Sequence, residues 1–140
     1  YPGLANIILA ARKINGSMPE FVLERTYEIM KEKGISEVSK VGFYGLTYKE
    51  NVDDIRESPT LQLIESMRKH LCGDIKVYDP YVKKEITGNQ FHNLDEFLEG
   101  VELLVVMVGH TEIIQNIEKI KNKIIFDTRN VIDLPNVYHL

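Results

Sequence analysis

The stretch "ELLVVMVG" (102–109) decides the fold class, because every position from 103 to 108 is apolar. A strand that is apolar on both faces has to be covered on both faces, which is typical of a parallel sheet between two layers of helices. Further strands are expected around it, at "KVGFYG" (40–45), "IKVYDP" (75–80), "KIIFD" (123–127) and, as an edge strand, "NVYHL" (136–140).

Helical patterns separate these strands. They cover 59–71, 93–100 and 111–120, where apolar residues recur at helical spacing. Ser58 followed by Pro59 is a typical helix start, and Asn93 is a candidate N-cap for the next helix. The alternation of strand and helix predicts an open, doubly wound α/β sheet with right-handed crossovers.

A helical segment precedes the first strand. Residues 4–15 and 21–33 both favour helix, and Gly34 ends the second stretch. Two alternatives stay open between them: Ser17, with an acidic residue three positions on, could cap a new helix, or one long helix could continue with a kink at Pro19. Apolar side chains lie on more than one face, so the segment needs partners beyond the domain that follows.

Composition excludes several classes of protein. The 140 residues carry a formal net charge of −4, which argues against nucleic acid as the main partner. No apolar run approaches the roughly 20 residues that span a bilayer, and no signal-peptide pattern opens the sequence. The single Cys72 excludes an internal disulfide, so we expect a cytoplasmic protein without a membrane partner. Because the sequence opens on Tyr1 without Met, we expect it to be part of a longer chain.

The candidate site is sought at the strand ends, because ligands of such sheets bind beyond the carboxyl ends of the strands. The polar residues there are the 45–58 loop, Asp79, His110 and "DTRN" (127–130). Asp79 with the following Pro is expected to form a strand-ending turn, and His110 a turn or a helix cap.

The cations of this edge have two interpretations each. Lys49 could contact a phosphate or carboxylate, or it could be a solvated loop lysine. Arg56 could face a ligand or form ion pairs within the loop, where the neighbouring acids are Asp53, Asp54 and Glu57. Arg129 has the same two interpretations, and its place after a strand favours ligand contact.

A dinucleotide site in this chain is disfavoured. The fingerprint G-x-G-x-x-G leads straight into a helix, whereas Gly42 and Gly45 form only G-x-x-G, and thirteen residues separate Gly45 from the helix. Cys72 lacks an acid–base partner nearby and is interpreted as structural. The four histidines show no metal-ligand spacing, so no metal is expected.

Five stretches together resemble the UDP-glucose/GDP-mannose dehydrogenase family: "ARKINGSMPEFV" (11–22), "GFYGLTYKENVDDIRESP" (42–59), "VYDPYV" (77–82), "VGHTEI" (108–113) and "FDTRNV" (126–131). The resemblance implies a Rossmann-like sheet preceded by a long central dimerisation helix, with the helix at 1–35 and a C-terminal nucleotide-sugar-binding domain at 36–140. Enzymes of this family oxidise the C6 alcohol of a nucleotide sugar to a carboxylate in two NAD-dependent steps.

The resemblance also assigns individual residues. It implies that Tyr48, Lys49 and Arg129 contact the UDP-sugar and that Arg56 reaches towards NAD. The NAD fingerprint and the catalytic Cys of the family are expected in a preceding domain, which would bind most of the NAD, so no catalytic residue is expected in this chain. A homodimer or higher homo-oligomer through the central helix is implied as well.

The substrate expected from the resemblance is a UDP-N-acetylhexosamine, above all UDP-N-acetylmannosamine. The "ARKIN" pattern and "RESP" are similar to the family branch that acts on these sugars. UDP-glucose and UDP-N-acetylglucosamine are the alternatives, and a non-catalytic nucleotide-binding or dimerisation module is the alternative of another class.

Overall fold

The computed structural model describes residues 18–47, 50–53, 55, 58, 60–62, 65, 75–86 and 89–139. The helical elements in these residues are α2 (Met18–Lys33), the 3-10 helix η1 (Val38–Lys40), α4 (Leu94–Leu98), α5 (Thr111–Gln115) and α6 (Ile117–Ile120). The strands are β1 (Val41–Tyr44), β2 (Lys76–Tyr78), β3 (Gln90–Phe91), β4 (Leu103–Val106), β5 (Ile124–Asp127) and β6 (Tyr138–His139).

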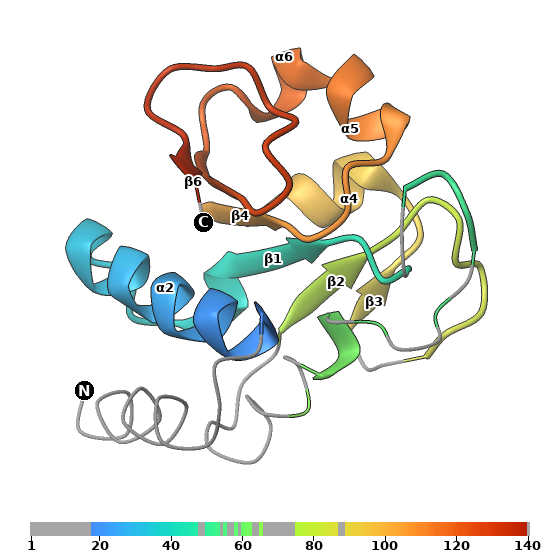
Figure 1. Cartoon of the computed structure of the whole chain (residues 1–140), viewed down its shortest axis with the longest axis horizontal. Coiled ribbons are helices and arrows are strands. Elements are labelled where there is room, and N and C mark those ends of the chain that lie inside the picture. Colours follow the sequence, from blue (N-terminus) through green and yellow to red (C-terminus); the bar gives the residue numbers. More distant parts are fainter. Residues whose placement is uncertain are drawn as a thin grey trace.

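These strands form one sheet in the order β3-β2-β1-β4-β5-β6, and every neighbouring pair is parallel. The chain moves outward from β1 to β3 and then returns to the centre with β4, so the order reverses between β1 and β4. Figure 1 shows α2 on one face of the sheet and α4, α5 and α6 on the other. The predicted doubly wound α/β fold is confirmed, and its crevice for ligands is expected at this reversal.

Two apolar clusters cover the two faces of the sheet, and β4 contributes to both. Leu103 and Val105 pack in the cluster that α2 completes. Leu104 and Val106 pack in the cluster that α4, α5 and α6 complete. Successive side chains of a strand point to opposite faces, which explains why a strand with both faces covered is apolar at every position.

The helix starts expected from the sequence are confirmed at two places. The Oγ of Ser58 accepts a hydrogen bond from the backbone N–H of Leu61 at 3.2 Å, and the described residues 60–62 and 65 are helical. The Oδ1 of Asn93 accepts from the N–H of Glu96 at 3.0 Å at the start of α4. Both side chains satisfy a backbone donor that the first turn of a helix leaves unpaired.

The segment 111–120 differs from the expectation of one amphipathic helix, because two short helices, α5 and α6, meet at Asn116. This residue has φ −111° and ψ 31°, which is not helical, and its Nδ2 donates to the carbonyl of Glu112 at 2.7 Å. An Asn side chain competes with the helix for backbone partners and so favours a break. The apolar spacing continues across the break, so periodicity did not reveal it.

The edge strands differ in how well the sequence predicted them. β6 lies within the expected 136–140 stretch at the edge of the sheet. β3 was not predicted, because two residues are too few to carry a periodic pattern. The side chain of Gln90 in β3 bonds to the backbone outside the strand. Its Oε1 accepts from the N–H of Ile86 at 2.7 Å, and its Nε2 donates to the carbonyl of Lys84 at 3.0 Å.

α2 ends at Gly34, as expected from the sequence. Gly34 has φ +72°, and the N–H of Ile35 closes the helix end on the carbonyl of Met30 at 2.8 Å. The expected helix over 4–15 and the two alternatives around Pro19 depend on residues before Met18, which lie outside the described part. No helix of the described part is both long and apolar enough to cross a membrane.

Candidate functional site

The polar centre of the carboxyl edge is Asp79, directly after β2. Its side chain is fully buried, and its Oδ2 accepts from the backbone N–H groups of Leu46 and Thr47 at 2.7 and 3.2 Å. Its Oδ1 accepts from the N–H of Tyr81 at 2.8 Å. The expected strand-ending turn is therefore present, and the same carboxylate also holds the beginning of the 45–58 loop.

His110 lies at the N-cap position of α5, yet its ring makes no cap hydrogen bond and is fully buried. Nε2 lies 2.8 Å from Oδ2 of Asp79 and 3.3 Å from Oγ1 of Thr47. Nδ1 accepts from the backbone N–H of Asn51 at 2.8 Å. A ring nitrogen that accepts carries no proton, so the imidazole is neutral here, and Nε2 donates to Asp79.

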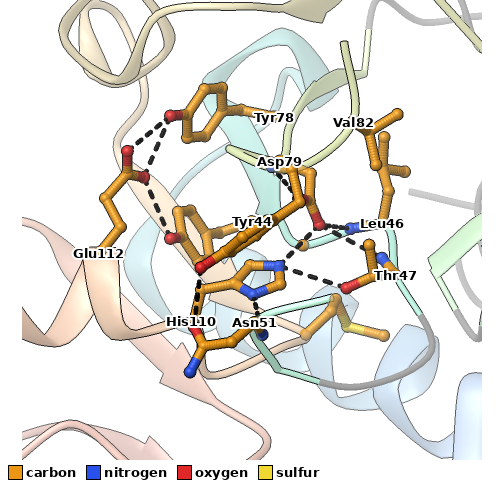
Figure 2. Close-up of polar contacts among 12 residues, drawn as sticks. Tyr44, Leu46, Thr47, Asn51, Tyr78, Asp79, Val82, His110 and Glu112 are labelled. Carbon is orange, nitrogen blue, oxygen red and sulfur yellow. Dashed lines mark hydrogen bonds and ion pairs between the residues drawn. The ribbon is translucent and has the colours of Figure 1, made fainter. Parts of the chain in front are cut away.

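The side chain of Asn51 also connects the chain after β1 to the start of α5 (Figure 2). Its Oδ1 accepts from the N–H of Thr111 at 3.0 Å, and its Nδ2 donates to Oγ1 of Thr111 at 2.9 Å. The hydroxyl of Tyr81 also donates to Oδ1 at 3.3 Å. Asn51 has φ +58°, a left-handed conformation that Asn tolerates better than most residues.

A second polar group lies beside the first, between β1, β2 and α5. Figure 2 shows Tyr44 and Tyr78 side by side, both directed at Glu112. Tyr44 donates to Oε1 of Glu112 at 3.1 Å, and Tyr78 donates to Oε1 and Oε2 at 3.0 and 2.9 Å. Burial, together with this carboxylate, raises the pKa of both phenols well above their usual value near 10. Both phenols therefore stay protonated and donate at neutral pH.

Arg129 follows β5 and is the one predicted site residue within the described part. The carboxylate of Asp127 shapes its turn by accepting from the N–H groups of Arg129, Val131 and Ile132 at 3.0, 2.7 and 2.7 Å. The Nε of Arg129 donates to the carbonyl of Met107 at 2.8 Å. Its Nη groups bond to none of the described residues, so this half-buried guanidinium keeps donors for an anion.

Tyr48, Lys49 and Arg56 lie outside the described residues, as do Asp54, Glu57 and Cys72. Asp53 is described and exposed.

Sequence reasoning included Asn51 only as a member of the 45–58 loop, and it missed Thr111 and Glu112 as parts of this edge. A usable signal for the last two was their position directly after His110, beyond the buried strand β4. The described residues contain no group of three His, Cys, Asp or Glu side chains able to hold a metal ion. The cation of Arg129, with Nη groups that bond to none of the described residues, suits this edge to an anionic ligand.

This geometry defines a doubly wound α/β domain. Its ligand edge is formed by Leu46, Thr47 and Asn51, which bond to Asp79 and His110, and by Arg129. The chain belongs to the UDP-glucose/GDP-mannose dehydrogenase family, because the model of that family's UDP binding domain matches residues 42–134. The resemblance seen in the sequence is thereby confirmed.

Individual relatives agree with this assignment. The chain is 38% identical over 137 residues to the UDP-N-acetyl-D-mannosamine dehydrogenase of Methanocaldococcus jannaschii. The aligned region covers 92% of this chain and 30% of that protein. The chain thus spans about 30% of the length of the curated relatives it matches.

Solved structures of two relatives are similar in fold and sequence. The UDP-D-ManNAc dehydrogenase from Pyrococcus horikoshii has a TM-score of 0.70 and 31% identity, with 91% of this chain and 31% of that chain covered. The UDP-N-acetyl-mannosamine dehydrogenase from Staphylococcus aureus has a TM-score of 0.69 and 34% identity over the same shares.

Proposed function

We propose that this chain is the C-terminal part of an NAD-dependent nucleotide-sugar 6-dehydrogenase and supplies its UDP-sugar-binding domain. The observation that carries the proposal is the match of the family's UDP binding domain to residues 42–134. These residues include positions 46–51 and Arg129. The complete enzyme would oxidise the C6 alcohol of the sugar to a carboxylate in two hydride transfers and would act in the cytoplasm in polysaccharide precursor synthesis.

The substrate we propose is UDP-N-acetyl-D-mannosamine, and the product is UDP-N-acetyl-D-mannosaminuronate. The proposal is supported by the relatives above, which are UDP-N-acetylmannosamine dehydrogenases and are 31–38% identical to this chain. Within the chain we propose residues 1–35 as the central dimerisation helix and 36–140 as the nucleotide-sugar-binding domain.

NAD does not fit the described residues of this chain. The backbone N–H of Gly45 is already bonded to the carbonyl of Tyr78 at 2.8 Å, and those of Leu46 and Thr47 to Asp79, so they cannot cradle a pyrophosphate. We therefore derive no hydride step within this chain and propose that a preceding domain binds most of the NAD. Arg56 is proposed to reach towards it.

Three residues are proposed to contact the UDP-sugar: Tyr48, Lys49 and Arg129. The geometry of Arg129 supports its role, because Nε is fixed on Met107 while the Nη groups remain available for a phosphate or carboxylate oxygen. The described residues around Tyr48 and Lys49 lie at the same carboxyl edge of the sheet.

The test is NADH production by the complete protein with four donors: UDP-N-acetylmannosamine, UDP-N-acetylglucosamine, UDP-glucose and GDP-mannose. We expect two NADH per UDP-N-acetylmannosamine and slower turnover of the other donors. Preference for another donor would overturn the proposed substrate. A complete reading frame without a G-x-G-x-x-G strand and a nucleophilic Cys before this chain would instead favour a non-catalytic module.

A homodimer or higher homo-oligomer is the proposed assembly, with the helix of 1–35 at its interface. Phe21 on α2 is 52% exposed and would become buried in such an interface. Sedimentation of the purified chain should give a dimer, and a strict monomer at high protein concentration would contradict the dimerisation helix.

A further inference from the structure

The chain is attached to the rest of the domain on both sides of positions 48 and 49. At one end, the N–H groups of Leu46 and Thr47 donate to Asp79. At the other end, the N–H of Asn51 donates to Nδ1 of His110. Figure 2 shows His110 between the two ends, with Nε2 on Asp79 and Nδ1 on Asn51.

Among the described residues, His110 is the side chain that bonds to both Asp79 and Asn51. Its ring is buried and is flanked by the ring of Tyr81, with centroids 4.8 Å apart, and by that of Tyr44 at 5.9 Å. One ring nitrogen bonds to Asn51 and the other to the carboxylate of Asp79. His110 lies at the N-cap position of α5, but neither ring nitrogen caps that helix. A histidine needed only for the helix start would bond to that helix.

The two attached ends flank sequence positions 48 and 49. Fixing both ends of a short segment removes conformational freedom before a ligand arrives, so less is lost on binding. Asp79 is buried, so its bonds to the N–H groups of Leu46 and Thr47 are shielded from competing water.

We propose that His110, together with Asp79 and Asn51, positions the loop that binds the nucleotide sugar. This inference rests on the proposed function, because it takes Tyr48 and Lys49 as the contacts to that ligand. His110 itself touches no substrate in this scheme and acts only through the loop, so it is a positioning residue.

Two substitutions of His110 in the complete enzyme separate the bonds of the two ring nitrogens. In His110→Asn, Oδ1 takes the place of Nδ1 and still accepts from Asn51, while the bond to Asp79 is lost. In His110→Gln, the amide N–H takes the place of Nε2–H and still donates to Asp79, while the bond to Asn51 is lost. Asp79 keeps its three backbone donors in both variants.

The readouts are KM for the UDP-sugar, KM for NAD and the melting temperature. His110→Gln should raise KM for the UDP-sugar about tenfold, the effect of one lost hydrogen bond. His110→Asn should stay within about threefold of the wild type, and KM for NAD should not change in either variant. His92→Gln makes the same chemical change at an exposed histidine and serves as the control.

A merely structural role predicts a different pattern, in which both His110 variants lose stability and raise both KM values alike. That result, or unchanged KM values throughout, would overturn the positioning role. If His110→Gln does not fold, the exposed Asn51→Gly keeps the left-handed backbone, removes only the bonds to Thr111 and Tyr81, and should raise KM for the UDP-sugar about threefold. An inactive wild type with all four donors would contradict the proposed function instead.

Discussion

At the scale of the residue, Arg129 is the predicted contact whose surroundings are known in detail. Nε is used on the carbonyl of Met107, and the Nη groups bond to none of the described residues. Lysine has one ammonium group and cannot hold that carbonyl and a ligand in the same fixed geometry.

Arg129→Lys is therefore expected to weaken UDP binding about tenfold, the effect of losing one charge-assisted hydrogen bond. Calorimetry of the chain against UDP would measure it. The exposed Lys83→Arg, which also exchanges one cation for another, is the control and should leave affinity unchanged. Equal affinity of Arg129→Lys and the wild type would show that the guanidinium stays in solvent.

Two buried tyrosines differ in what their hydroxyl groups meet. Tyr27 on α2 is fully buried, and its hydroxyl has no hydrogen-bond partner in the described structure, so burying it costs free energy. Tyr44 is equally buried, but its hydroxyl donates to Glu112.

Tyr27→Phe is expected to raise the free energy of unfolding by about 1 kcal/mol, whereas Tyr44→Phe should lower it by about 1 kcal/mol. Urea unfolding of the two variants beside the wild type would measure both. A loss of stability in Tyr27→Phe would mean that the hydroxyl makes a bond in solution.

At the scale of the element, the exit of β1 depends on Gly45. Its φ is +106°, and a Cβ there would lie 2.6 Å from Cβ of Val108 and 2.8 Å from its backbone nitrogen. The loop that begins at Gly45 is also tied to the next helix, because Oγ1 of Thr60 donates to the carbonyl of Gly45 at 2.7 Å. A displacement of this strand end is therefore expected to disturb the bonds of Leu46 and Thr47 to Asp79 as well.

Gly45→Ala is expected to lower the free energy of unfolding by about 3 kcal/mol, from the left-handed backbone and the clash together. Gly34→Ala is the matched control, because its φ is also positive but nothing lies within 4 Å of the added Cβ. It should cost only about 1 kcal/mol. Equal losses in chemical denaturation would mean that the β1 exit can shift to accommodate the methyl group.

At the scale of the whole molecule, alkaline pH acts on the phenols that join the sheet to α5. Tyr44 and Tyr78 have a pKa raised by burial and by Glu112, whereas in the unfolded chain each titrates near 10. The two folded phenols thus bind more protons than the unfolded ones above pH 10, so their contribution to stability is fully present below pH 10 and falls as pH rises from there.

The double variant Tyr44→Phe, Tyr78→Phe should have a smaller loss of stability between pH 9 and pH 11, because two of the responsible groups are absent. Urea midpoints across this range measure the loss, and the wild type is the reference. An identical pH profile in both proteins would show that other groups govern alkaline unfolding.

How much the sequence could predict follows from the range over which each signal acts. The apolar run at 103–108 predicted a covered parallel strand, and the capping residues Ser58 and Asn93 predicted helix starts, since both signals depend on neighbours along the chain. The family resemblance was likewise readable from contiguous motifs. The break at Asn116 and strand β3 escaped because neither alters the local periodicity.

The sequence by itself determined the alternation of strands and helices, the polar carboxyl edge and the family. Only the tertiary structure decided the partners at that edge, such as Asp79 with Leu46, His110 with Asn51, and Glu112 with two tyrosines. These pairs are 33 to 68 residues apart in the chain. Contacts of that separation arise from the crossovers of a parallel sheet, which bring distant strand ends to one side and leave no mark on local sequence.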